Sequence, residues 1–246
     1  MPTKRRASAR QSPRYGVARV ISKLGLGSRT QAARWIDEGR VRVNGALVRD
    51  GEYPVTRGVD RVTVDGREHA PPVRLVVMLN KPRGLLTTVR DEQGRETVYS
   101  CLKGSGLPWL APVGRLDKAS EGLLLFTNDP SWASRIAGPA GGHRKTYHVQ
   151  IDRLADPALL EALERGAVVD GERLGAHTAR LLRSGTRNSW LEIVLVEGRN
   201  RQIRRLMSAF GTCVLRLVRV AIGPLALGDL PKGAWRVLDS AEFEDL

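Results

Sequence analysis

The residues with the clearest capacity for chemistry lie in a charged loop between two glycines. Gly114 and Gly122 bracket Asp117, and Arg115 stands two residues before it. A buried strand is expected directly after this loop, over residues 123–127, so the loop can hold a carboxylate at the mouth of a cleft. Such a carboxylate can act as a nucleophile or as a general base. On residue types alone, a solvated surface loop is the alternative.

A second segment places arginines at the start of a predicted helix. Asn200 is expected to cap this helix, and Arg201, Arg204 and Arg205 follow at once. The helix macrodipole disfavours a cation there by about 0.3–1 kcal/mol. We therefore expect a compensating anion, either a buried carboxylate or an RNA phosphate. Surface arginines that the helix merely tolerates are the alternative.

An aromatic residue sits in a third segment with alternating character. Tyr147, Val149 and Ile151 share one face of a strand predicted over residues 146–151. A core tyrosine is the simple interpretation. The same ring could also form a wall that stacks on an extruded base.

The net charge of +14 indicates a polyanionic partner. Residues 1–14 contain five basic and no acidic residues, residues 15–70 contain ten against seven, and the remainder contains 25 against 19. The charge is therefore not confined to an N-terminal arm. We expect nucleic acid rather than a membrane, because no amphipathic helix with a large apolar face is visible.

Metal, cofactor and membrane classes have little support in the sequence. Cys101 and Cys213 are too few for a four-thiolate site, and the histidines lack ligand spacing. Neither a P-loop nor a Rossmann glycine motif is present. The longest apolar run, at residues 75–79, is far short of the roughly 20 residues that span a bilayer. We expect no metal, no cofactor and no membrane association, and a cytoplasmic location.

The element pattern predicts two folded parts after a disordered basic arm over residues 1–14. Helices over residues 17–24 and 28–39, then a hairpin at Asn44-Gly45, indicate a small unit over residues 15–66. Its basic residues could face RNA; they are Lys23, Arg29, Arg34, Arg40 and Arg42.

The larger part, over residues 74–246, has more strands than helices. A linker at Pro71-Pro72 precedes it, and Asp156 is expected to cap a helix that closes at Gly166. The fold class is therefore α+β, with a mostly antiparallel mixed sheet and flanking helices. Further strands are predicted at residues 74–79, 190–196 and 214–220.

Two motifs resemble known families. Residues 24–45, with the pair Ser28-Arg29 and the ending Gly39-Arg-Val-Arg-Val-Asn-Gly45, resemble the S4 RNA-binding domain. The run from Gly114-Arg-Leu-Asp117 to Glu121-Gly-Leu-Leu-Leu-Phe-Thr-Asn-Asp129 resembles the active-site motif of the RNA pseudouridine synthases. Within that family the branch typified by the small-subunit enzyme A is most similar, over residues 74–240. The turn at residues 80–84 matches as well, whereas Ser120 stands where the family commonly has threonine.

The resemblance implies roles for the candidate residues. Asp117 would be the catalytic carboxylate, Arg204 its ion-pair partner and Tyr147 the aromatic beside the target base. Because the target base must leave its stack to be reached, Arg115 is in addition a candidate to hold the flipped nucleotide or fill the space that it leaves. The remaining basic residues of the arginine segment would contact RNA; they are Arg199, Arg201 and Arg205.

We therefore expect a monomeric, cofactor-free enzyme that isomerises a uridine of bacterial ribosomal RNA, with 23S favoured over 16S. Asp117 would attack the ribose C1′ or remove the C2′ proton, and the sequence leaves both routes open. The alternative is a non-catalytic S4-type RNA-binding or ribosome-assembly factor. A transfer or messenger RNA target is a further alternative.

Overall fold

The computed structural model divides into two compact units: the described residues of the first are 13–56, 59–68, 73 and 108–110, and those of the second are 74–89, 91–107, 111–138 and 142–246. Most of the predicted basic arm and the linker Pro71-Pro72 lie outside the described residues. No helix in the described part of the chain is long and apolar enough to cross a membrane. The described ranges are 13–56, 59–68, 73–89, 91–138 and 142–246.

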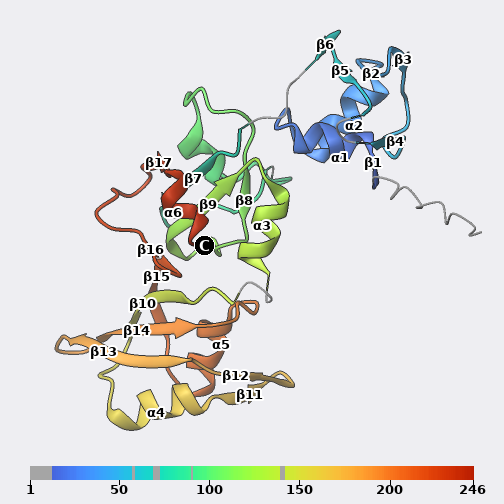
Figure 1. The fold of residues 1–246 in the computed structure, drawn as a ribbon. Helices are drawn as coiled ribbons and strands as arrows, with labels where there is room; N and C mark the ends of the chain where they lie inside the picture. The colour runs from blue at the N-terminus through green and yellow to red at the C-terminus, as the bar shows by residue number, and fades with distance from the viewer. Residues whose placement is uncertain (1–12, 57–58, 69–72, 90, 139–141) are drawn as a thin grey trace, which may run out of the picture. The chain divides into compact units, whose positions relative to one another are not determined.

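The N-terminal unit combines two helices with two small antiparallel sheets, ordered β1-β4 and β3-β2-β5-β6 (Figure 1). Its elements are β1 (Arg14–Gly16), α1 (Val17–Lys23), α2 (Arg29–Asp37), β2 (Val41–Val43), β3 (Ala46–Leu47), β4 (Pro54–Thr56), β5 (Val62–Val64) and β6 (Arg67–Glu68).

Local sequence signals explain these elements. Ser28 caps α2 by accepting a hydrogen bond from the Gln31 amide at 3.1 Å. Asn44 and Gly45 both have positive φ, at 51° and 84°, as a tight hairpin turn requires. Val17, Ile21 and other apolar residues of both helices and of the strands then share one buried core.

The C-terminal unit is built on one mixed sheet with the main order β13-β14-β10-β15-β9-β7-β17, to which β16 and β8 are added at β15 and β9. A separate hairpin is formed by β11 and β12. The strands are β7 (Val76–Lys81), β8 (Ala111–Val113), β9 (Glu121–Thr127), β10 (Lys145–Ile151), β11 (Ala167–Val169), β12 (Glu172–Leu174), β13 (Thr178–Ser184), β14 (Ser189–Leu195), β15 (Val214–Ile222), β16 (Leu225–Ala226) and β17 (Trp235–Val237).

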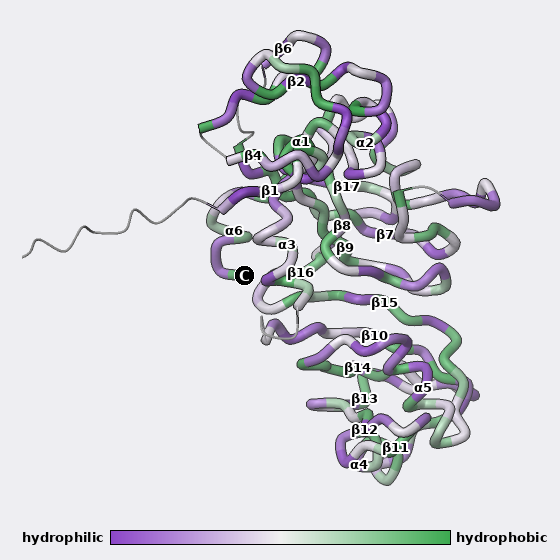
Figure 2. Tube along the Cα trace, turned by 90° about the vertical axis from the view of Figure 1, so that its right-hand side faces the viewer, coloured by the Kyte–Doolittle hydropathy of each residue, from purple (hydrophilic) through white to green (hydrophobic). Residues whose placement is uncertain are grey.

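Helices cover parts of this sheet, and the chain is hydrophobic along β9 and much of β14, whereas β10 is largely hydrophilic (Figures 1 and 2). Trp132 of α3 and Phe243 of α6 meet edge to face at 6.0 Å in a core shared with β7 and β9. Asp156 caps α4 by accepting from the Leu159 amide at 2.7 Å, as predicted. The helices are η1 (Val98–Leu102), α3 (Pro130–Ala137), α4 (Pro157–Arg165), α5 (Gln202–Ala209) and α6 (Ser240–Glu244).

The two halves of the sheet are joined by one short pair of parallel strands, β9 and β15, which we call the parallel seam. β9 and β15 pair through only two residue pairs, Glu121 with Val218 and Gly122 with Arg219, and the other strand pairs of this sheet are antiparallel. Gly122 has φ of 99°, and a Cβ there would lie 2.2 Å from the Arg219 carbonyl oxygen. Glycine is therefore required for the strands to approach. The α+β class with a mostly antiparallel mixed sheet is confirmed.

One predicted cap is wrong. The N-cap of α5 is Arg201, in the left-handed region with φ of 50° and ψ of 30°, and not Asn200. The Gln202 side chain explains the shift: its oxygen accepts from the Arg199 amide and its nitrogen donates to the Gly175 carbonyl. These bonds fix the turn before α5, so the helix begins one residue later than it would if Asn200 were its N-cap.

Candidate active site

A cavity of about 300 Å³ gathers most of the predicted site residues within the C-terminal unit. Its walls come from the loop after β8, from β10 and β15, from α3 and from the start of α5. Asp117 is the only carboxylate among the described residues that line it. Five basic side chains share the lining: Arg115, Lys145, Arg199, Arg201 and Arg219.

The loop that carries Asp117 is fixed through its backbone by a buried lysine. Lys81, at the end of β7, is fully buried. Its Nζ donates to the carbonyl oxygens of Asp117 at 3.1 Å, Ser120 at 2.8 Å and Pro82 at 3.1 Å. Burial lowers the pKa of Lys81 to about 8.

The other carbonyl oxygens of this loop also have donors from outside it. Thr87 Oγ1 donates to Leu116 at 2.7 Å, and the Gly84 amide donates to Lys118 at 2.7 Å. Arg204 Nη2 donates to Ala119 at 3.2 Å. Together with Lys81, these groups hold all five consecutive carbonyls of residues 116–120. The backbone is therefore set while the Asp117 side chain, 33% exposed, stays accessible.

The cation nearest the Asp117 carboxylate is Arg201, not Arg204. Arg201 Nη1 lies 3.7 Å from Asp117 Oδ2, and its side chain is 52% exposed. Arg204 turns to backbone oxygens instead, donating to Ala119 and, at 3.1 Å, to Val214. The predicted ion pair between Asp117 and Arg204 is therefore wrong: the Arg204 guanidinium binds a backbone carbonyl of the loop and not the Asp117 carboxylate. Burial and then Arg201 lower the pKa of Arg204.

Tyr147 and Arg115 both line the cavity, but the first is buried and the second is exposed. Tyr147 lies on β10 with only 8% of its surface exposed, and it shares the buried face with Val149 and Ile151. Arg115 is exposed and makes no ion pair among the described residues. The tyrosine therefore forms a fixed wall, whereas the arginine side chain can move toward a ligand.

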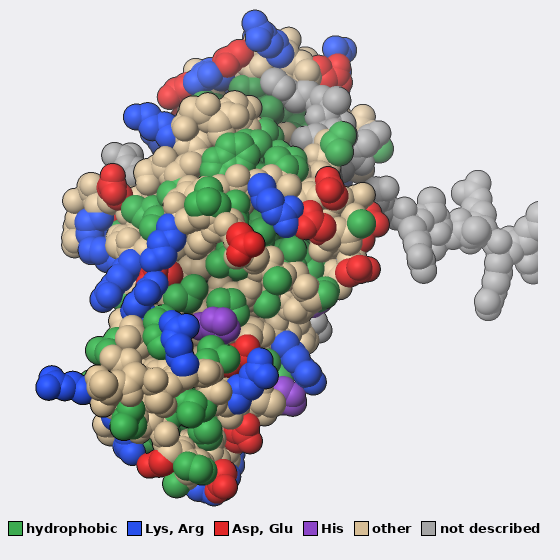
Figure 3. Space-filling view, turned by 90° about the vertical axis from the view of Figure 1, so that its left-hand side faces the viewer, with side chains coloured by type: hydrophobic (Ala, Val, Ile, Leu, Met, Phe, Trp, Pro, Cys, Tyr) green, Lys and Arg blue, Asp and Glu red, His purple; other side chains and the backbone are tan. Residues whose placement is uncertain are grey.

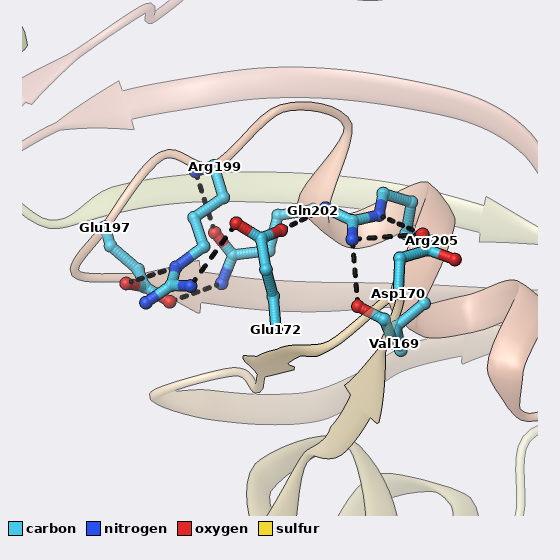
Figure 4. A network of polar contacts seen from close by, with 7 residues as sticks. All are labelled: Val169, Asp170, Glu172, Glu197, Arg199, Gln202 and Arg205. Atoms are coloured by element: carbon cyan, nitrogen blue, oxygen red, sulfur yellow. Dashed lines mark hydrogen bonds and ion pairs between the residues drawn. The ribbon is translucent and has the colours of Figure 1, made fainter.

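Two further arginines that were predicted to bind RNA, Arg199 and Arg205, also pair with carboxylates of the protein itself (Figure 4). Arg205 contacts Glu172 at 2.6 Å and Asp170 at 3.1 Å, and it donates to the Val169 carbonyl. Arg199 pairs with Glu197 at 3.0 Å and lies 3.6 Å from Glu172. These contacts tie α5 and the turn before it to the hairpin β11–β12.

The predicted RNA-binding residues of the N-terminal unit also differ in their contacts. Arg40 pairs with Asp65 at 2.6 Å and Glu38 at 3.0 Å and lies over the Trp35 ring. Lys23 lies over the Tyr15 ring at 4.9 Å. The remaining three, Arg29, Arg34 and Arg42, are exposed. On the face drawn in Figure 3, Lys and Arg side chains lie among Asp and Glu side chains rather than in one block.

Sequence reasoning missed several residues that shape the site. Lys81 and Thr87 position the Asp117 loop, and Lys145 and Arg219 line the cavity. Lys81 lies in the turn at residues 80–84, whose resemblance to the family was the available signal, and Lys145 directly precedes the strand predicted over residues 146–151. Nothing local marks Thr87 or Arg219, because their partners lie 29 and 96 residues away.

Family comparisons agree with this geometry. The model of the family described as RNA pseudouridylate synthase matches residues 75–209, and the S4 domain model matches residues 17–60. A crystal structure of a pseudouridylate synthase is similar with a TM-score of 0.62 and 29% identity, covering 95% of this chain and 99% of that one.

Curated relatives are similar along most of their length. An uncharacterised RNA pseudouridine synthase of Aquifex aeolicus is 38% identical over 94% of this chain and 92% of its own. The ribosomal large subunit pseudouridine synthase B of Escherichia coli (strain K12) is 38% identical over 91% of this chain and 79% of its own.

Proposed function

This chain belongs to the RNA pseudouridylate synthase family, with an S4 domain at its N-terminal side, and from that premise we propose that it converts a uridine of ribosomal RNA to pseudouridine with Asp117 as the catalytic carboxylate. The observation that carries the proposal is the cavity itself. Among its described lining residues it holds a single carboxylate, on a loop whose backbone is fixed, and it shares that lining with the buried Tyr147.

The geometry supports a reaction that needs one carboxylate. Asp117 either bonds to the ribose C1′ or takes the C2′ proton, and in both routes the C1′–N1 bond breaks. The uracil then turns and joins C1′ through C5. Arg201 Nη1 lies 3.7 Å from Asp117 Oδ2 and places a positive charge beside the reacting carboxylate. The target base must leave its stack, and Tyr147 offers a buried ring beside it.

The large ribosomal subunit is the proposed source of the substrate. Several relatives at 37–38% identity are named ribosomal large subunit pseudouridine synthase B. An enzyme that acts on this RNA would work in the cytoplasm, and a single chain contains every residue proposed for the site. We therefore propose a cytoplasmic monomer that modifies 23S rather than 16S RNA.

The N-terminal unit is proposed to bind RNA outside the cavity. Arg29, Arg34 and Arg42 are exposed, and an S4 domain model matches this part of the chain. Arg40 is paired with Asp65 and Glu38, so we assign it to stabilising the fold rather than to contacting RNA. Removing positive charge at the three exposed arginines should weaken RNA binding and flatten its salt dependence.

Pseudouridine mapping tests the proposed function. Ribosomal RNA from a strain lacking the gene is compared with RNA from strains that carry the wild-type or the Asp117→Asn chain. We expect one 23S site to lose its modification, to regain it with the wild type and not with Asp117→Asn. A lost 16S site would correct the subunit. Unchanged modification in both ribosomal RNAs would contradict the proposal and favour a transfer or messenger RNA target or a non-catalytic RNA-binding factor.

A further inference from the structure

We propose, resting on the function proposed above, that Arg219 and Lys145 form a cationic subsite that binds the carbonyl oxygens of the target uracil and stabilises the uracil anion released from C1′. The subsite lies on the wall of the cavity that Asp117 lines, and it is made by two neighbouring strands, β10 and β15.

A β-bulge brings these side chains to the cavity. Arg219 on β15 pairs with Tyr147 on β10, and Ile222 pairs with Lys145, with a register shift between Thr146 and Tyr147. Along β15 the buried face therefore runs from Leu217 and Arg219 to Ile222, two positions and then three. Bulges beside active sites commonly re-aim a side chain in this way. Here the bulge gathers two cations and one tyrosine on one wall.

Both cations are buried and lack a counter-ion. Arg219 is 5% exposed and Lys145 is 9% exposed, and neither has a carboxylate partner in the described part of the chain. Burial and then the charge of Arg219 lower the pKa of Lys145. Placing two like charges together away from water is unfavourable unless an anion joins them.

Their hydrogen bonds are also incomplete. Lys145 Nζ donates only to the His143 carbonyl, at 3.1 Å, and Arg219 Nε donates to the Leu123 carbonyl, at 2.7 Å. Arg219 Nη2 is buried and has no partner. Lys81, which is also buried, uses three donors on three carbonyl oxygens. Arg219 and Lys145 therefore retain donor capacity for a ligand, and both line the cavity, whereas Arg204, whose Nε is also buried without a partner, does not line it.

Uracil is the ligand whose chemistry fits this capacity. When the C1′–N1 bond breaks, both electrons go to the base, and the charge spreads from N1 onto O2 and O4. After the base turns, C5 bonds to C1′, C5 loses its proton and N1 gains one, so no atom is lost overall. Donors placed where charge develops stabilise the transition state more than the bound substrate. The apolar side chains of Leu195, Leu217 and Ile222 complete the wall.

Single-turnover kinetics with full-length protein test the subsite. The substrate is unmodified 23S RNA transcribed with tritium at uridine C5, which pseudouridine formation releases. We expect Arg219→Gln and Lys145→Gln each to lower the rate constant by about 10²-fold, the size of losing one oxyanion donor. RNA affinity should stay within about twofold of wild type, and Arg219→Lys should recover part of the rate, because it restores the charge.

The matched control is Arg165→Gln, which removes the same charge from an exposed position on α4. Melting curves for all variants separate lost catalysis from lost folding. If Arg219→Gln does not fold, Lys145→Gln decides, because Lys145 makes a single backbone hydrogen bond. Folded variants that react within about threefold of wild type would overturn the subsite. A wild-type chain that releases no tritium from 23S or 16S RNA would instead count against the proposed function.

Discussion

Two neighbouring segments of the C-terminal unit are fixed in opposite ways. The Asp117 loop, residues 116–120, is held by its backbone carbonyls, through donors such as Lys81 and Arg204. The arginine segment, residues 197–205, is held mainly by its side chains, through carboxylates such as Glu172. In the first case the side chains stay available for chemistry. In the second case the arginine charges already form ion pairs within the fold.

This difference teaches which charged residues are available to a substrate. A motif rich in arginine suggests RNA contacts, yet an arginine that pairs with two carboxylates has little capacity left for a phosphate. Conversely, an aspartate whose main chain is fixed from outside needs no bond of its own to stay in place. Because backbone bonds hold the loop, the Asp117 side chain can react without also having to keep the loop in place. Four substitutions test this division of roles.

The largest expected effect is that of Asp117→Asn. This substitution removes the charge with little change of shape, and the loop keeps its backbone bonds. We expect pseudouridine formation to fall by at least about 10³-fold, toward the upper range for an acid–base group, with RNA affinity and melting temperature nearly unchanged. Tritium release near the wild-type rate would remove Asp117 from the mechanism.

Lys81→Met should have the next largest effect. Three carbonyl oxygens lose a buried donor, which we expect to lower the free energy of unfolding by about 1–3 kcal/mol. A displaced loop should lower activity by about 10–100-fold. Lys81→Gln, which keeps a donor, serves as the milder companion. Equal activity in Lys81→Met and wild type would show that the lysine does not position Asp117.

The pKa of Lys81 adds a pH dependence to this comparison. Because burial lowers it from 10.5 to about 8, the folded chain releases this proton at lower pH than the unfolded chain does. The unfolding free energy of the wild type should therefore rise relative to that of Lys81→Met between about pH 8 and pH 10.5, by up to about 1.4 kcal/mol per pH unit. Parallel urea-denaturation curves across that range would contradict the burial of a charged amine.

Arg204→Ala should be intermediate. It removes donors to Ala119 and Val214, so we expect a stability loss of about 1–3 kcal/mol and an activity loss near tenfold. Because the contact is to backbone, the loss should be additive with that of Asp117→Asn, with a coupling within about 0.5 kcal/mol of zero in a double-mutant cycle. A larger coupling would restore the ion pair that the sequence predicts.

The smallest effect is expected for Arg205→Ala. Its partners Glu172 and Asp170 are exposed, so stability should fall by about 1 kcal/mol or less. RNA affinity and its salt slope should stay unchanged, because the guanidinium already has carboxylate partners. Arg115→Ala, at an exposed arginine without an ion pair in the described residues, should reduce the slope by about one. A flatter slope for Arg205→Ala would support the RNA contact predicted for it.

The sequence predicts well those structural features that depend on residues close together along the chain, such as helix caps and tight turns. Ser28, three residues before Gln31, and the pair Asn44-Gly45 act locally, and the structure has the predicted cap and turn there. The alternation around Tyr147 likewise appears as a strand with one buried face. By contrast, β13 has only one buried residue and therefore lacks the alternation that would reveal it.

The site was harder to predict because its bonds join distant segments. The arginines at the start of α5 do have the compensating groups that the helix dipole demands, but for Arg204 these are backbone carbonyls, which carry no sequence signal. Lys81 reaches the Asp117 loop across 36 positions. The bulge near Tyr147, which brings Arg219 and Lys145 together, depends on strand register alone.

The parallel seam between β9 and β15 has a consequence for the order in which the molecule forms. Glu121 and Val218, which pair at the seam, are 97 positions apart, whereas β7, β8 and β9 pair within residues 76–127 and β10, β13, β14 and β15 within residues 145–222. Contacts between distant positions form more slowly, because a long loop must close first. The cavity takes walls from both sides of the seam, so it is complete only when the seam closes. Refolding chains should therefore regain their strand content before they regain activity.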